Sequence, residues 1–262
     1  MNKIILSIFI IFLCSCSQSS ISPVDDYPLL KESEQYFRKA ITAEEPDRSE
    51  FFIRSALSLE QAAKDYNLDN GYLYYNAGNG WFKSGNIGRA ILNYRKALNR
   101  LPSNSNIKNN LELARSEVEN HIERIEANPI VKTLFFIHYD LSFQMRVISM
   151  IVLLFLTIAC ASILLFNINK IIRNVQYILS IILLIFCISI LIDISSKEQG
   201  VIISPEVIAR KGDSEGYDSS FTRPLTEGVE FLLLNERNGW FFIELSDGRT
   251  CWIPGDTADL ID

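Results

Sequence analysis

Two long apolar runs divide the chain. Residues 147–166, VISMIVLLFLTIACASILLF, contain no charged side chain, and residues 175–192, VQYILSIILLIFCISILI, contain none either. A helix needs about 20 predominantly apolar residues to cross a bilayer. We therefore predict transmembrane helices at 147–166 and 175–194, joined as a hairpin by the loop 167–174.

A pattern with the period of an α-helix precedes these runs. Residues 71–84 place Tyr75, Gly78, Trp81 and Phe82 at helical spacing, and Gly85 breaks that helix. A second apolar stripe follows at i, i+3, i+4 and i+7, and Pro102 ends it. Its members are Ile87, Ala90, Ile91, Tyr94, Ala97 and Leu98. These residues predict two antiparallel helices, which the small residues at 78, 90 and 97 allow to approach closely.

The same organisation extends to both sides. Ala56 and Ala63 stand 34 residues before Ala90 and Ala97, which predicts helices at about 28–43 and 47–65. Residues 105–127 form a long amphipathic pattern that closes the stack. Its apolar face consists of Ile107, Leu111, Ala114, Val118 and Ile122. Residues 28–127 are thus predicted to be an all-α domain.

The C-terminal residues 200–262 change to short β-rich runs. Asn238-Gly239 and Asp247-Gly248 separate these runs and suit tight hairpin turns. Four or five strands of this length make a small barrel. The predicted fold is therefore multi-part, with helical repeats, a transmembrane hairpin and a small all-β barrel.

Residues 128–146 connect the helical domain to the first apolar run. This stretch is rich in aromatic residues, namely Phe135, Phe136, Tyr139 and Phe143. Aromatic side chains gather at the headgroup level of membranes, so this stretch fits an interfacial segment. A plain connector into the first span is the alternative.

The N-terminal residues 1–16 show the pattern of a secretory signal peptide. Lys3 is followed by an apolar stretch and then by Leu13-Cys14-Ser15-Cys16. This end resembles the lipobox of bacterial lipoproteins, and the resemblance implies lipidation of Cys16. The alternative is an ordinary leader in which the cysteines are incidental.

Charge sets the orientation and excludes one class of partner. The loop 167–174 holds Lys170 and Arg173 and no acidic residue, so the positive-inside rule makes it cytoplasmic. The leader independently places the N-terminal part outside, which predicts periplasmic soluble parts on a bacterial inner membrane. The formal net charge of −6, without a cluster of Lys and Arg, argues against a nucleic-acid partner.

Neither a metal nor a cofactor is expected. The five cysteines lie in the leader, in the apolar runs and at Cys251, so a disulfide framework is not predicted. Two histidines and the absence of a CxxC pair disfavour a metal site. The sequence contains no HExxH and no P-loop, so no catalytic residues are assigned.

The helical stretch is similar to a tetratricopeptide repeat. The residues on the repeat's pattern positions are Tyr74, Gly78, Trp81, Ala90, Tyr94, Ala97 and Pro102. The family implies peptide binding on the inner face of the first helices. The corresponding residues are Tyr72, Tyr75, Asn79, Phe82 and Lys83, with Asn79 bonding a ligand backbone. Packing of these aromatic residues between helices is the alternative.

The C-terminal part resembles the bacterial Src-homology-3-like family. The stretches VIARKGDSEG, NGWFFIEL and DGRTCWIP occur in the order of that family. The resemblance implies binding of cell-wall peptides or other proteins. We expect Trp240 to pack in the core and Trp252 to form an exposed site.

The order of the parts resembles BatE-like proteins of the Bacteroides aerotolerance family. That resemblance implies an inner-membrane component grouped with von Willebrand factor A-type proteins and a MoxR-type ATPase, linked to aerotolerance or envelope stress. The expected function is a non-enzymatic protein-interaction scaffold. The alternatives are a lipoprotein whose barrel binds peptidoglycan and a wall-modifying enzyme that the barrel targets.

Overall fold

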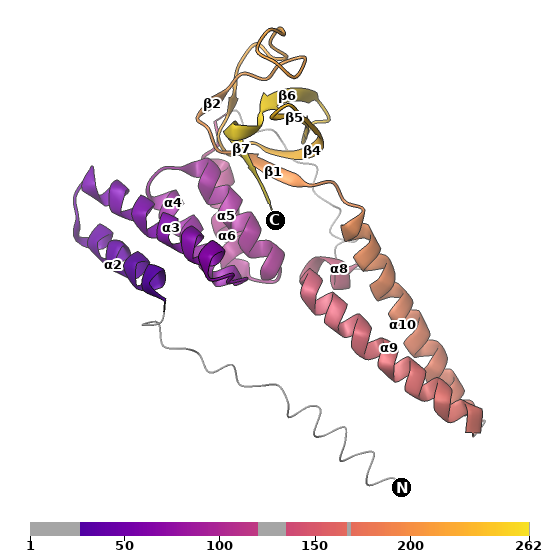
Figure 1. Cartoon of the computed structure of the whole chain (residues 1–262). Coiled ribbons are helices and arrows are strands. Elements are labelled where there is room, and N and C mark those ends of the chain that lie inside the picture. The colour runs from indigo at the N-terminus through magenta and orange to yellow at the C-terminus, as the bar shows by residue number, and fades with distance from the viewer. Residues whose placement is uncertain (1–26, 120–134, 167–168, 262) are drawn as a thin grey trace.

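A computed structural model describes residues 27–119, 135–166 and 169–261 of the chain (Figure 1). The helices are α2 (Pro28–Thr42), α3 (Asp47–Asp65), α4 (Gly71–Lys83), α5 (Ile87–Arg100), α6 (Ser105–Ser116), α8 (Phe136–Asp140), α9 (Phe143–Phe166) and α10 (Lys170–Ile194). The strands are β1 (Gln199–Ile202), β2 (Glu206–Val207), β3 (Leu225–Thr226), β4 (Glu230–Arg237), β5 (Trp240–Leu245), β6 (Thr250–Pro254) and β7 (Ala258–Leu260). The chain is thus a multi-part α and β protein. The expected leader, with Cys16, lies outside the described residues.

The helical part, residues 27–119, contains the predicted helices. The expected helices at 28–43, 47–65 and 71–84, and the helix that Pro102 ends, are confirmed within one to two residues. Asn70 caps α4 by accepting a hydrogen bond from the Tyr72 amide at 2.9 Å. A Cβ atom on Gly78 would lie 2.7 Å from the Tyr94 ring, so glycine is needed where α4 and α5 approach.

The last helix of this part is shorter than predicted. We expected a helix over 105–127, but α6 ends at Ser116, and Ile122 lies outside the described residues. Val118 is buried beyond the helix end, and the Thr226 hydroxyl donates to the Glu119 carbonyl oxygen at 2.7 Å. Contacts with the sheet part, residues 199–261, thus hold residues 117–119 out of the path of α6.

The sheet part contains one five-stranded antiparallel sheet in the order β6-β5-β4-β1-β7 and a separate β2-β3 pair. Asn238 and Gly239 have positive φ angles, 54° and 77°, which confirms the predicted turn between β4 and β5. The described residues do not form the closed barrel that we predicted. The outer side of β6 is instead met by the β2-β3 loop, where the Arg210 amide donates to the Trp252 carbonyl oxygen at 2.7 Å. A loop thus covers the edge that a barrel would close with a strand.

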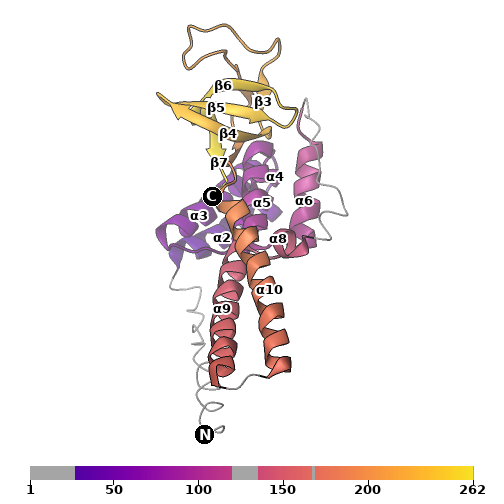
Figure 2. The same ribbon diagram turned by 90° about the vertical axis from the view of Figure 1, so that its right-hand side faces the viewer.

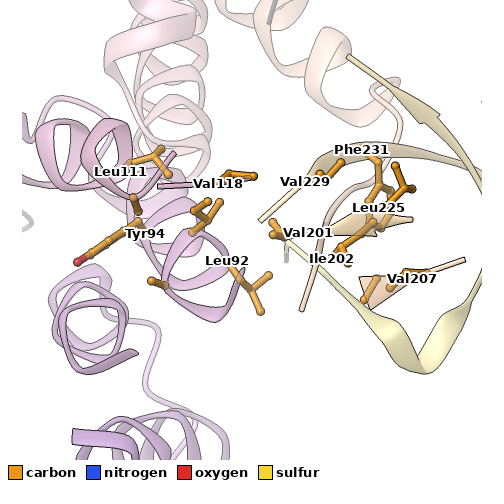
Figure 3. Close-up of a cluster of buried hydrophobic side chains, with 14 of the residues drawn as sticks. Leu92, Tyr94, Leu111, Val118, Val201, Ile202, Val207, Leu225, Val229 and Phe231 are labelled. Carbon is orange, nitrogen blue, oxygen red and sulfur yellow. The ribbon is translucent and has the colours of Figure 1, made fainter. Parts of the chain in front are cut away.

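One hydrophobic core runs through both the helical part and the sheet part. The predicted stripe residues Ala90, Ile91, Tyr94 and Ala97 are buried in it. From the sheet part the cluster takes in Val201, Ile202, Val207, Leu225, Val229 and Phe231. Figure 3 shows Leu92 and Val118 in this cluster together with Val201 and Val229. The two parts therefore pack as one body.

Charged groups complete this interface. Glu230, only 9 % exposed, accepts from Arg115 Nε at 2.7 Å and lies 3.5 Å from Arg95 Nε. Glu227 Oε2 accepts from the Gly88 amide at 2.9 Å, at the N-terminal turn of α5. A carboxylate is favourable there because the first amides of a helix have no partner within it.

The hairpin consists of α9 and α10, which pack side by side. Both helices are long and apolar enough to cross a membrane, with 24 and 25 residues. They begin earlier than the predicted spans, at Phe143 and Lys170. Most of their large apolar side chains are exposed, and the hairpin extends away from both the helical part and the sheet part (Figure 2). This surface is suited to contact with lipid.

The aromatic connector is described from residue 135 onward. It includes the short helix α8 at the end of the hairpin that adjoins the helical part. Phe135, Phe136, Tyr139 and Phe143 are all exposed. Their placement at headgroup depth stays a prediction.

Candidate functional site

Two of the predicted groove residues, Tyr75 and Asn79, belong to a hydrogen-bond network. Asn79 Oδ1 accepts from the Tyr94 hydroxyl and from Asn110 Nδ2, each at 2.9 Å. Asn110 Nδ2 also donates to the Tyr75 hydroxyl at 3.2 Å. The Asn79 oxygen that was expected to bind a ligand backbone thus joins α4, α5 and α6 instead. Burial raises the pKa of the Tyr94 hydroxyl, which keeps it a donor.

The other three groove residues differ in exposure. Phe82 is half-buried and packs against the core, whereas Lys83 is exposed, with Nζ 5.6 Å from the centroid of the Phe52 ring. Tyr72 is 55 % exposed. Tyr72 and Lys83 therefore present the most accessible side chains of the predicted set. Peptide binding by this face stays a prediction.

Tyr72 also lines a cleft of about 1210 Å³ next to the hairpin. The start of α4 and the end of α5 form one wall of this cleft, and α8, the start of α9 and the end of α10 form the other. The lining alternates apolar groups, such as Leu101 and Phe143, with charged groups, such as Asp193 and Lys197. Such a mixed lining can hold a peptide segment by both packing and hydrogen bonds.

A polar cluster that the sequence patterns did not predict crosses the helical part. Glu60 Oε1 accepts from Trp81 Nε1 and from Asn93 Nδ2, each at 2.7 Å. The Arg89 guanidinium lies 5.0 Å from the Trp81 ring centroid. The signal for this cluster was a polar residue, Asn93, among the apolar neighbours of the α5 stripe. Its role is to join α3, α4 and α5.

The predicted surface of the sheet part is centred on Trp252. Its ring stacks on Phe242 with centroids 5.1 Å apart, and the Arg237 guanidinium lies 5.2 Å from it. Arg237 also donates to Asp213 at 2.6 Å and holds the pKa of Asp213 below its usual range. Trp240 and Trp252 are both half-buried, so the expected contrast between a core and an exposed tryptophan is absent.

Residues 212–216, GDSEG, have the letters of the G-x-S-x-G nucleophile motif. That motif needs a sharp turn between a strand and a helix. Here it lies in the loop between β2 and β3, and Ser214 is exposed. The stretch therefore does not form a nucleophile elbow. Across the described ranges, no three His, Cys, Asp or Glu side chains are grouped to hold a metal ion.

No family model matches the chain, and neither a curated protein nor a solved structure matches it. Function must therefore be inferred from the geometry and from the sequence patterns.

Proposed function

We propose that this protein is a membrane-anchored scaffold for protein–protein interaction. The observation that carries this proposal is the core shared by the helical part and the sheet part. The chain enters the hairpin after the helical part and leaves it into β1. Two parts that share a core lie on one side of a membrane, and a hairpin of two spans returns the chain to the side from which it started.

The proposed side is the periplasm of a bacterial inner membrane. Lys170 and Arg173 flank the far end of the hairpin, and the positive-inside rule favours a cytoplasmic position for them. The leader pattern supports the same orientation. An anchor of this kind raises the effective concentration of the scaffold towards membrane-bound partners without any new contact.

The finer part of the proposal concerns family and partners. The paired helices α2–α3 and α4–α5, with α6 at the end, support the resemblance to tetratricopeptide repeats. The order of parts supports a BatE-like member of the Bacteroides aerotolerance family. On this basis we propose von Willebrand factor A-type membrane proteins as partners. The binding surface extends from the exposed side chains of Tyr72 and Lys83 into the adjoining cleft.

The experiment is capture of partners by the full-length tagged protein after cross-linking in intact membranes. We expect membrane proteins with von Willebrand factor A-type domains among the captured chains, and a weaker yield with Tyr72→Ala. Tyr217→Ala is the matched control, because Tyr217 is 50 % exposed in the distant β2-β3 loop. An equal loss of captured partner in both variants would contradict binding through the helical part.

The same material separates the alternative function. A wall-binding lipoprotein would sediment with purified peptidoglycan, and Trp252→Ala would reduce that binding. If peptidoglycan is bound and no membrane protein is captured, the scaffold proposal is wrong.

A further inference from the structure

A charged cluster joins the elements at the soluble end of the hairpin. It consists of His138 from α8, Arg146 from α9, and Ser189 and Asp193 from α10. Arg146 is only 4 % exposed, although it belongs to a helix with an apolar surface. Buried charge in such a helix is costly unless it is paired, and it commonly marks a functional position.

Arg146 is the centre of this cluster. Its Nη2 atom forms an ion pair with Asp193 Oδ2. Its Nη1 atom donates to the Ser189 hydroxyl at 2.8 Å and to the Ser189 carbonyl oxygen at 3.3 Å. These bonds connect the first turn of α9 to the last turns of α10. They close the hairpin at this end.

His138 adds α8 to the cluster, and its contacts favour one tautomer of the neutral ring. Its Nδ1 atom lies 3.0 Å from Arg146 Nη1, and a guanidinium can only donate. Nδ1 therefore accepts, and the proton of a neutral ring is on Nε2, which lies 3.7 Å from Asp193 Oδ1. Nδ1 also lies 3.2 Å from the Ser189 hydroxyl. A proton on Nδ1 would still place two N–H groups 3.0 Å apart, so the closed arrangement favours an imidazole without a proton on Nδ1.

We propose that these four residues form a proton-sensitive latch, which is closed with neutral His138 and opens when His138 is protonated. Protonation places an N–H group of His138 against the N–H group of Arg146 and removes the acceptor. The groups facing the ring are Arg146 from α9, Ser189 and Asp193 from α10, and Tyr139 from α8 itself. The imidazolium and the Arg146 guanidinium then repel each other beside the Asp193 carboxylate.

Opening the latch also changes the adjoining cleft. His138, Arg146 and Asp193 are part of its lining, and Asp193 is followed within six residues by β1. In addition, Arg146 Nε is buried without a hydrogen-bond partner in the part of the chain that the structure describes. A buried donor without an acceptor costs free energy, and opening the cluster would let this donor find an acceptor. The latch therefore couples acidity to the shape of the cleft, whatever partner the cleft receives.

Cys187 supplies one half of a reporter of hairpin closure. Cys187 Sγ of α10 lies 3.8 Å from Met150 Sδ of α9, one turn from the latch. The full-length protein with Met150→Cys and Cys160→Ser should form a disulfide between positions 150 and 187 under copper phenanthroline in membranes. The yield is read from the loss of two free thiols by intact mass.

The test compares this parent with the same protein carrying His138→Asn. Asparagine places an acceptor oxygen near the position of Nδ1 but does not take up a proton. Rates are divided at each pH, which cancels the pH dependence of the thiols. We expect a ratio of parent to His138→Asn near one at pH 7.5 and a fall of about tenfold by pH 5.5. A ratio that stays at one would overturn the proposal.

Arg146→Gln gives the second measure. It removes the ion pair, so cross-linking should be slow at both pH values. Cross-linking as fast as in the parent at pH 7.5 would show that Arg146 does not close the hairpin, and the latch would be wrong. If this variant is not inserted, the comparison with His138→Asn still decides the outcome.

Partner capture through Tyr72 is measured separately at pH 7.5, so failure of the scaffold proposal is distinguishable from failure of the latch.

Discussion

At the scale of single residues, the side chains that join the helices are polar ones within the apolar stripes. Helical periodicity predicted the face on which Tyr75 and Asn79 lie. It did not predict that Asn110 of α6 completes their hydrogen bonds, because a pattern within one helix contains no information about its neighbour's polar groups. The face that carries the predicted site could therefore be predicted from sequence. Which polar atoms on that face are already hydrogen-bonded within the protein could not.

Replacement of Glu60 tests this role of polar residues. Glu60→Ala leaves Trp81 Nε1 and Asn93 Nδ2 without their acceptor. We therefore expect the free energy of unfolding to decrease by about 2 kcal/mol. Glu60→Gln keeps an acceptor oxygen and should cost less than half of that. The measurement is thermal unfolding of the full-length protein in detergent, followed by tryptophan fluorescence. Equal losses in the two variants would contradict the assigned role.

Cys251 gives a pH-dependent prediction. Burial raises the pKa of its thiol to about 12, from an ordinary value of 9.0, so the folded state favours the neutral thiol. This contribution to stability is complete below pH 9 and decreases by up to about 1.4 kcal/mol per pH unit as the pH rises towards 12.

The advantage in melting temperature of the unmodified protein over Cys251→Ala should therefore narrow between pH 8 and pH 10.5. A difference that stays constant would show that the thiol is not buried as described.

At the scale of elements, the positions of the helices and of the turn between β4 and β5 followed closely from the sequence, whereas two features depended on other elements. The helix predicted to reach residue 127 ends at Ser116, because Val118 and Glu119 contact the sheet part. The predicted barrel is open, because a loop meets the edge of β6. Both features arise from contacts between residues more than 40 positions apart, which local periodicity does not contain.

Gly88→Ala tests one such contact, because an isolated helix and the packed body predict opposite changes in stability. Alanine is favoured over glycine inside a helix by about 1 kcal/mol, so Gly88→Ala would stabilise an isolated α5. In the packed body, the added Cβ would lie 2.5 Å from the Ile202 carbonyl oxygen. We therefore expect a lower melting temperature of the full-length protein. Gly216→Ala, at an open position whose only near atom is Ser214 Oγ at 3.7 Å, is the control.

At the scale of the whole molecule, the helical part and the sheet part are united by one hydrophobic core. Their sequences predicted two separate modules on either side of a hairpin. The shared core and the contacts of Glu230 with Arg95 and Arg115 make them one body instead. Sequence patterns show which residues are buried, but they do not show which distant segment those residues pack against. The shared core could therefore not be predicted from them. The two parts therefore present their surfaces in a fixed relation to one another.

The most direct test of this account is disulfide formation between Glu119→Cys and Thr226→Cys in intact cells without added oxidant. The Thr226 hydroxyl reaches the Glu119 backbone at 2.7 Å, and the periplasm is oxidising whereas the cytoplasm is reducing. A disulfide therefore requires that both parts share one side, that this side is the periplasm, and that the interface is packed. We predict a disulfide in most of the chains, with little in the control pair Lys83→Cys and Thr226→Cys. Two free thiols at positions 119 and 226 in folded, membrane-inserted protein would contradict the account.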